Sequence, residues 1–171
     1  MSKNELELSK IFQGDVGMSY KKRIEAAENY ILSIVDNKNA FGNNKEIIYP
    51  PQTRYKHSFA DGVYIREITV DKGVVLIGFI HKHKEAFFLL KGRLIIMTKE
   101  GVEEYIAPCY VIAPRGSKKM GYSVEESVVV TIHANPTNTQ NLKELEDNMV
   151  VYNWDEYDEF LKQNEKNEKN K

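Results

Sequence analysis

Hydrophobic residues recur every three or four positions between residues 19 and 37, and the charged residues among them fall mostly on the other side of a helical wheel. This spacing predicts an amphipathic helix over residues 20–36, with Ser19 as a candidate N-cap. The Asn-rich segment at 36–44 is typical of a helix end and a loop. The apolar positions of this helix are Ile24, Ala27, Tyr30, Ile31, Ile34 and Val35.

From residue 55 to about residue 134 the pattern changes to short runs of Val, Ile, Phe, Tyr and Thr. Short strands with frequent turns favour an antiparallel β-sandwich or barrel, and no long helical pattern interrupts them as a parallel sheet would require. Turn signals occur at 60–62, 71–73, 91–92, 99–101 and 114–116. The candidate core residues are Phe87, Phe88, Leu89, Leu90, Leu94, Ile95, Ile96, Val111, Ile112, Val128, Val129, Val130 and Ile132. Because these runs are apolar on both faces, we expect the outer face to be covered by the 20–36 helix or by a second subunit.

After Pro136 the pattern is helical again, and Trp154, Tyr157 and Phe160 form one apolar stripe. The last residues carry no apolar side chain, which predicts a disordered tail. The expected organisation is an N-terminal helical extension and linker over 1–54, a β-domain over 55–136, C-terminal helices over 137–162 and a tail over 163–171.

A chain of 171 residues fits one domain. The formal net charge of −1 gives no field that would attract a nucleic-acid polymer. The apolar runs are shorter than a membrane span and the amino end lacks a signal-peptide core, so we expect a soluble, cytoplasmic protein. The single cysteine, Cys109, has no internal disulfide partner and is interpreted as a small apolar residue.

The segment HKHKE at 81–85 is the strongest chemical signal. On a strand, His81, His83 and Glu85 share one face, and imidazole with carboxylate suits zinc, iron, manganese or nickel. The two histidines lie about 7 Å apart along a strand, but Glu85 would lie about 13 Å from His81, so a shared metal requires a bend near Lys84. The alternative is a pair of solvated histidines beside a weak surface ion pair.

Four further residues are candidates for a pocket. His133 ends an apolar strand and is either a further metal ligand or a hydrogen-bonded structural residue. His57 begins the β-region and either lines the pocket or caps a turn. If Arg66 and Lys119 both face the cavity, it favours an anion such as a carboxylate or phosphate; otherwise both are solvated surface cations.

His81-x-His83, Glu85, Gly92 and the later Pro114-Arg115-Gly116 resemble the two signature motifs of the cupin superfamily. Over residues 57–148 the chain is similar to cupin-like proteins of tailed bacteriophages. The resemblance implies a mainly β single cupin, a small antiparallel β-barrel or jelly roll that holds a divalent metal on two His, a Glu and a further His. It also implies a homodimer, and the host cytoplasm if a phage encodes the protein.

The motifs depart from the family pattern at two places. Only Lys84 separates His83 from Glu85, where the family leaves three or four residues, and Lys119 stands where the second motif places a histidine. A lysine ammonium has no lone pair for a metal. We therefore predict a metal-binding cupin with a small polar or anionic ligand, with or without turnover. The alternatives are a sequestering protein for a nucleotide-like molecule and a metal-free assembly module.

Overall fold

The computed structural model describes residues 19–34, 53–99 and 101–169. The expected loop at 36–44 and most of the linker lie outside these residues. The elements are α2 (Tyr20–Ile34), β1 (Thr53–Ala60), β2 (Val63–Val70), β3 (Val75–Ile77), β4 (Ile80–His81), β5 (Glu85–Lys91), β6 (Arg93–Met97), β7 (Val102–Ile106), β8 (Cys109–Ala113), β9 (Met120–Ser123), β10 (Ser127–Ala134), α3 (Leu142–Met149), β11 (Val150–Val151) and α4 (Trp154–Lys169).

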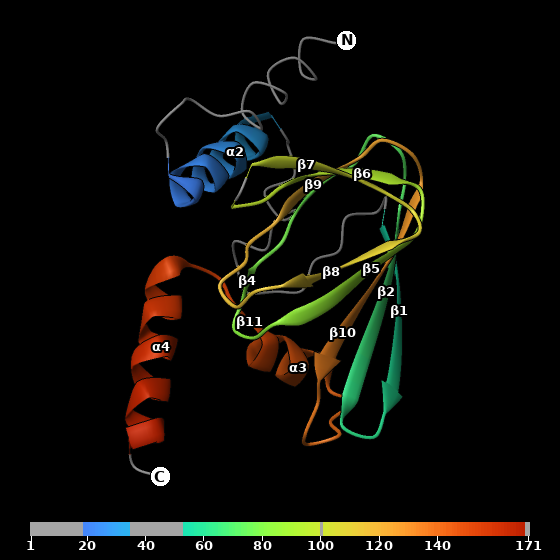
Figure 1. The fold of residues 1–171 in the computed structure, drawn as a ribbon. Helices are drawn as coiled ribbons and strands as arrows, with labels where there is room; N and C mark the ends of the chain where they lie inside the picture. Colours follow the sequence, from blue (N-terminus) through green and yellow to red (C-terminus); the bar gives the residue numbers. More distant parts are fainter. Residues whose placement is uncertain (1–18, 35–52, 100, 170–171) are drawn as a thin grey trace.

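Two antiparallel sheets face each other, one with the order β1-β2-β10-β5-β8 and the other with the order β3-β9-β6-β7 (Figure 1). Between them lies a core of alternate residues from both sheets, because successive side chains of a strand point to opposite faces. These core residues are Phe87, Leu89, Leu94, Ile96 and Val129. The predicted mainly β fold, a jelly roll with flanking helices, is confirmed. In the described ranges no helix combines the length and apolarity needed to span a membrane.

Helix α2 packs on the outer face of the four-stranded sheet. Its fully buried Ile24 and Ala27 pack in one cluster with Met97 and Met120, which lie on the outer face of β6 and β9. The predicted amphipathic helix is therefore confirmed within the described residues, and it covers one sheet only.

The outer face of the other sheet is partly open. Leu90 on β5 is 54% exposed and Ile112 on β8 is 57% exposed, so their prediction as core residues was wrong for the isolated chain. Both belong to the outward-facing set of their strands, and no helix among the described residues lies over them.

Helix α4 continues to Lys169, beyond residue 162, after which we expected a disordered tail. The Asn153 side chain accepts a hydrogen bond from the Glu156 amide at 2.9 Å, which caps the start of the helix. The polar residues that follow are mostly Glu, Lys and Gln, which are good helix formers without any apolar contact.

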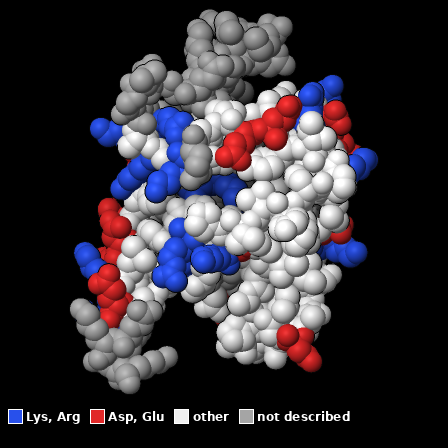
Figure 2. All heavy atoms as spheres, in the orientation of Figure 1, with Lys and Arg blue, Asp and Glu red and all other residues white. Residues whose placement is uncertain are grey.

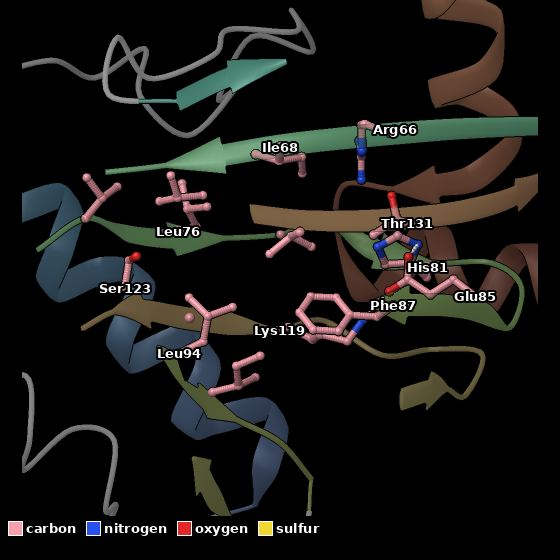
Figure 3. Close-up of a pocket in the computed structure, with 16 residues that line it drawn as sticks. Arg66, Ile68, Leu76, His81, Glu85, Phe87, Leu94, Lys119, Ser123 and Thr131 are labelled. Carbon is pink, nitrogen blue, oxygen red and sulfur yellow. Dashed lines mark hydrogen bonds and ion pairs between the residues drawn. The ribbon is translucent and has the colours of Figure 1, made fainter. Parts of the chain in front are cut away.

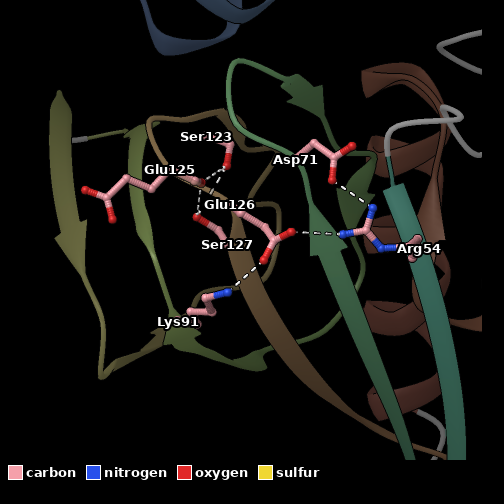
Figure 4. Close-up of polar contacts among 7 residues, drawn as sticks. All are labelled: Arg54, Asp71, Lys91, Ser123, Glu125, Glu126 and Ser127. Atoms are coloured by element: carbon pink, nitrogen blue, oxygen red, sulfur yellow. Dashed lines mark hydrogen bonds and ion pairs between the residues drawn. The ribbon is translucent and has the colours of Figure 1, made fainter.

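Polar contacts join the strand ends farthest from the site described below. Arg54 on β1 bonds Asp71 at 2.7 Å and Glu126 at 3.3 Å, and Lys91 bonds Glu126 at 2.7 Å (Figure 4). These groups are exposed, so each pair contributes little to stability. Gly92 adopts φ 87°, and a Cβ there would lie 2.4 Å from the Glu126 carbonyl oxygen. Glycine is thus required where β5 turns into β6.

Candidate metal centre and the inner cavity

A bend in the chain brings His81 and Glu85 together. Strand β4 ends at His81 and β5 begins at Glu85, so the three residues between them are not a strand. The His81 amide donates to the Ser117 carbonyl at 3.0 Å, and the His81 carbonyl accepts from the Gly116 amide at 2.7 Å. With the backbone held in this way, His81 Nδ1 lies 3.2 Å from Glu85 Oε2. The predicted bend is confirmed.

His133 completes a three-residue cluster. It lies on β10, and its Nε2 is 3.8 Å from Glu85 Oε2. The His81 and His133 rings are stacked with centroids 5.8 Å apart. One potential ligand atom from each of His81, Glu85 and His133 lies within 4.8 Å of the others, and all three residues are buried.

The structure places His83 outside this cluster. The bend turns its ring toward helix α4, where it meets Phe160 edge-on at 5.6 Å. The alternation that put His81 and His83 on one face applies only within a strand, and residues 82–84 are not part of one. His83 does line a hollow of about 380 Å³ together with His81 and His133, which we call the outer hollow.

Both histidines of the cluster are neutral at pH 7. Burial lowers the pKa of His81 well below its ordinary value, and the charges of Lys119 and Arg66 lower it further. Burial, followed by the charge of Arg66, lowers the pKa of His133 to about 3. A neutral imidazole keeps a nitrogen lone pair, so each ring can bind a metal without first losing a proton.

One oxygen of Glu85 lacks a hydrogen bond. Lys119 Nζ forms an ion pair with Glu85 Oε1, whereas Oε2 is buried and finds no hydrogen-bond partner among the described residues. A buried carboxylate oxygen without a donor is costly, and it lies between two neutral imidazoles. A cation would satisfy it. Two imidazole nitrogens and one carboxylate oxygen are a suitable ligand set for a divalent transition metal.

His81 and Glu85 of this cluster line the polar end of an inner cavity of about 130 Å³ between the sheets (Figure 3). Arg66 and Thr131 are paired in the register of β2 and β10 and both line this cavity. Arg66 Nε is buried with no hydrogen-bond partner among the described residues. Lys119 lines the same end, so two cations face one carboxylate and the cavity favours an anion. The opposite end is mainly apolar, with Ile68, Leu76 and Leu94 around Ser123.

His57 lies behind the cluster. Its Nδ1 is 2.7 Å from the Tyr64 hydroxyl, and the two rings are stacked at 5.9 Å. Tyr64 stacks in turn on His133, also at 5.9 Å. His57 is therefore two rings away from the metal cluster and supports His133 through Tyr64.

Sequence reasoning missed Thr131 and Tyr64. The Thr131 hydroxyl lies 2.9 Å from His133 Nε2, and their shared strand face was the available signal. Tyr64 shares a strand face with Arg66, but its contact with His133 depends on the pairing of β2 with β10, which opposes the two residues.

No protein-family model matches the sequence, and curated proteins give no match either. Similar solved structures include KdgF from a Halomonas species, with 14% identity over 55% of this chain and 92% of the other, and a TM-score of 0.46. A cupin superfamily protein from Desulfitobacterium hafniense has 11% identity over 52% and 83%, with a TM-score of 0.45. An acetylacetone dioxygenase from Acinetobacter johnsonii has 14% identity over 57% and 76%, with a TM-score of 0.43. These likenesses concern the shape of about half of the chain and not its ligand.

Proposed function

We propose that the protein binds a divalent transition metal on His81, Glu85 and His133 and a small anionic ligand beside it. The observation that carries this proposal is Glu85 Oε2, a buried oxygen without a hydrogen-bond partner among the described residues, 3.2 Å and 3.8 Å from two histidine nitrogens. Zinc, iron, manganese and nickel all suit this ligand set.

A bound metal would supply Lewis acidity, which polarises a carbonyl or activates water or oxygen. The chain's own residues have separate roles. Arg66 and Lys119 neutralise the ligand's negative charge, the Thr131 hydroxyl offers a hydrogen bond, and Phe87 helps to close the cavity against water. These roles are compatible with isomerase, hydrolase or dioxygenase chemistry, and equally with binding alone.

Metal analysis of the purified protein tests the proposal. We expect about one equivalent of a transition metal per chain, as isolated or after incubation with Zn²⁺, Fe²⁺, Mn²⁺ or Ni²⁺ followed by desalting. Glu85→Gln and His133→Ala should reduce the metal content and weaken binding by at least about tenfold. His83→Ala is the matched control and should retain the metal. Loss of metal in His83→Ala with retention in His133→Ala would contradict the proposed ligand set.

Sequestration without turnover is the second candidate, and Lys119 favours it. Its ammonium is ion-paired with Glu85 and contributes a fixed positive charge where the cupin motif places a further ligand. A phage origin, implied by the sequence resemblance, fits the capture of a small host metabolite. Mass spectrometry of the supernatant after denaturation should then reveal an unaltered small anion in stoichiometric amount. A protein that carries none and converts added substrate would instead be an enzyme.

A homodimer completes the proposal. Phe88, Leu90, Tyr110 and Ile112 form a contiguous outward-facing apolar patch on β5 and β8, and Tyr110 and Ile112 are more than half exposed. A second copy placed over this patch would bury it.

A further inference from the structure

A second and larger cavity opens beside the inner one. It has a volume of about 590 Å³ and is bounded by the start of α2, strands β6 to β8, the turn at 114–117 and the start of α4. We call it the vestibule. Figure 2 shows Lys and Arg atoms gathered on the part of this face between α2 and α4, whereas the part over the sheet edge is mostly free of charge.

The vestibule and the inner cavity meet at shared walls. Phe87, Ile96 and Lys119 line both. Ligand sites for organic molecules usually occupy about 300–1,000 Å³, so the inner cavity of about 130 Å³ can hold only the tip of such a molecule. The vestibule has room for the rest.

The charged residues of the vestibule favour an anion. Lys21, Lys99, Arg115 and Lys119 line it, and the sole carboxylate among its lining residues is Glu103. That carboxylate accepts hydrogen bonds from the Thr98 and Tyr105 hydroxyls. Among the residues that the structure describes, no hydrogen bond or ion pair joins the Arg115 guanidinium or the Lys99 ammonium to a carboxylate. Their charge is thus available to a ligand.

Aromatic side chains also line the vestibule. Trp154 and Tyr157 of α4 line the vestibule and meet edge-to-face at 6.3 Å. Lys21 Nζ lies 5.5 Å from the centre of the Trp154 ring, which holds a cation next to an aromatic face. Such a wall suits a flat ring that carries negative charge.

The turn that carries Arg115 is held in place by its neighbours. Gly116 has φ 76°, and a Cβ at this position would lie 2.8 Å from the Tyr157 hydroxyl. The Gly116 amide also donates to the His81 carbonyl. The turn that presents Arg115 is therefore fixed both to α4 and to the backbone of a metal-cluster residue, and this preorganisation reduces the entropic cost of binding.

We infer that the vestibule is a binding subsite for an aromatic phosphate monoester, with the phosphate against Arg115, Lys21 and Lys99 and the ring against Trp154 and Tyr157. Phosphate is favoured over carboxylate because a dianion suits a cavity that four cationic side chains and a single carboxylate line. A natural ligand longer than this monoester would extend past Lys119 toward the metal cluster. Only this extension rests on the proposed function.

Calorimetric titration with phenyl phosphate tests this subsite, with inorganic phosphate and phenol as partial probes. We expect phenyl phosphate to bind at least tenfold more tightly than either. Arg115→Ala, an exposed position that should not disturb folding, is expected to weaken binding about 10- to 100-fold, as the loss of a charge-assisted hydrogen bond implies. Trp154→Ala should weaken phenyl phosphate binding and leave inorganic phosphate binding unchanged.

Lys84→Ala is the matched control, because it removes one cation from the outer hollow and none from the vestibule. Equal affinity of Arg115→Ala and wild type, or loss of binding in Lys84→Ala alone, would overturn the inference. Repeating the titration with Glu85→Gln separates the two proposals. Glu85→Gln is expected to lose metal and to keep its affinity for phenyl phosphate. Phenyl phosphate binding by wild-type protein that takes up no metal would support the subsite and contradict the metal centre, whereas metal uptake by wild-type protein without phenyl phosphate binding would do the reverse.

Discussion

His133 is a residue whose charge state the fold controls. Its pKa in the folded chain is about 3, whereas an unperturbed histidine titrates near 6.5. Between these two values the unfolded chain binds a proton that the folded chain does not, so folding becomes less favourable as the pH falls. Above pH 6.5 the titration of His133 does not lower the free energy of unfolding. As the pH falls from 6.5 toward 3, that free energy decreases progressively. His81 is shifted in the same direction.

We predict that the metal-free protein loses stability on mild acidification through these histidines. Each proton difference corresponds to about 1.4 kcal/mol per pH unit, so His133 alone should lower the free energy of unfolding by about 2 kcal/mol between pH 7 and pH 5. Urea denaturation of chelator-treated protein at the two pH values measures this loss. His133→Gln should show a smaller loss than wild type, and equal losses in both proteins would contradict a buried neutral histidine at this position.

The three metal-cluster residues were all candidate metal ligands from the sequence, together with His83, which lies outside the cluster. Residue type and the need for a bend pointed to His81 and Glu85. The direction of the bend decides that His133 joins them and that His83 turns to Phe160 instead. That direction depends on hydrogen bonds from His81 to residues 116 and 117, more than thirty positions away, which local spacing cannot reveal.

At the scale of elements, α2 is joined to the sheet by a buried ion pair as well as by apolar contacts. Lys118 Nζ lies 2.8 Å from Glu28 Oε2, and the lysine side chain is only 6% exposed. The Tyr20 hydroxyl donates to the Lys118 carbonyl, so the first turn of the helix contacts the segment just before β9. A buried ammonium is tolerated because its carboxylate partner is present.

We predict that Glu28→Gln destabilises the protein by about 1–3 kcal/mol, because it leaves the Lys118 charge buried without its partner. Adding Lys118→Met should recover much of this loss, since the unpaired charge is then removed. Chemical denaturation of the two single variants and the double variant measures the coupling. Glu25→Gln, on the exposed side of the same helix, should change stability by less than about 0.5 kcal/mol. If the effects of Glu28→Gln and Lys118→Met on the free energy of unfolding simply added, the ion pair would contribute no coupling energy to stability.

Element types were predictable where periodicity was strong, as in α2 and in β5. The elements against which they pack were less predictable. The sequence allowed either α2 or a second subunit over the outer face of β5, and only the assembled sheets show that α2 packs on Met97 and Met120 of the other sheet. The extent of α4 was missed for another reason: helix propensity extends a polar segment without any apolar stripe to mark it.

At the scale of the whole molecule, the apolar patch on β5 and β8 is a surface that the described helices leave open. Phe88 and Tyr110 face each other in the strand register and their rings lie 5.7 Å apart. Tyr110 is 68% exposed, and its strand β8 is an edge strand of the sheet. An exposed apolar edge promotes association, and a two-fold axis through it would let the same patch of each subunit face its counterpart. In Figure 2 the surface over these strands is mostly uncharged.

We predict that the protein is a dimer in solution and that Ile112→Asp makes it a monomer. A carboxylate at the centre of the patch would have to lose its water in the interface without a partner, which costs more than the contact returns. Sedimentation equilibrium over a range of concentrations should give twice the chain mass for wild type and a single chain mass for the variant.

Val102→Asp is the matched control, because Val102 is a 40% exposed valine on β7, in the other sheet. It should remain dimeric, which separates a specific interface from a general effect of added negative charge. A wild-type protein that sediments as a monomer at all concentrations would exclude the second copy as the partner of this face. If Ile112→Asp also left the free energy of unfolding unchanged, the patch would be exposed in the native protein and available to a different molecule.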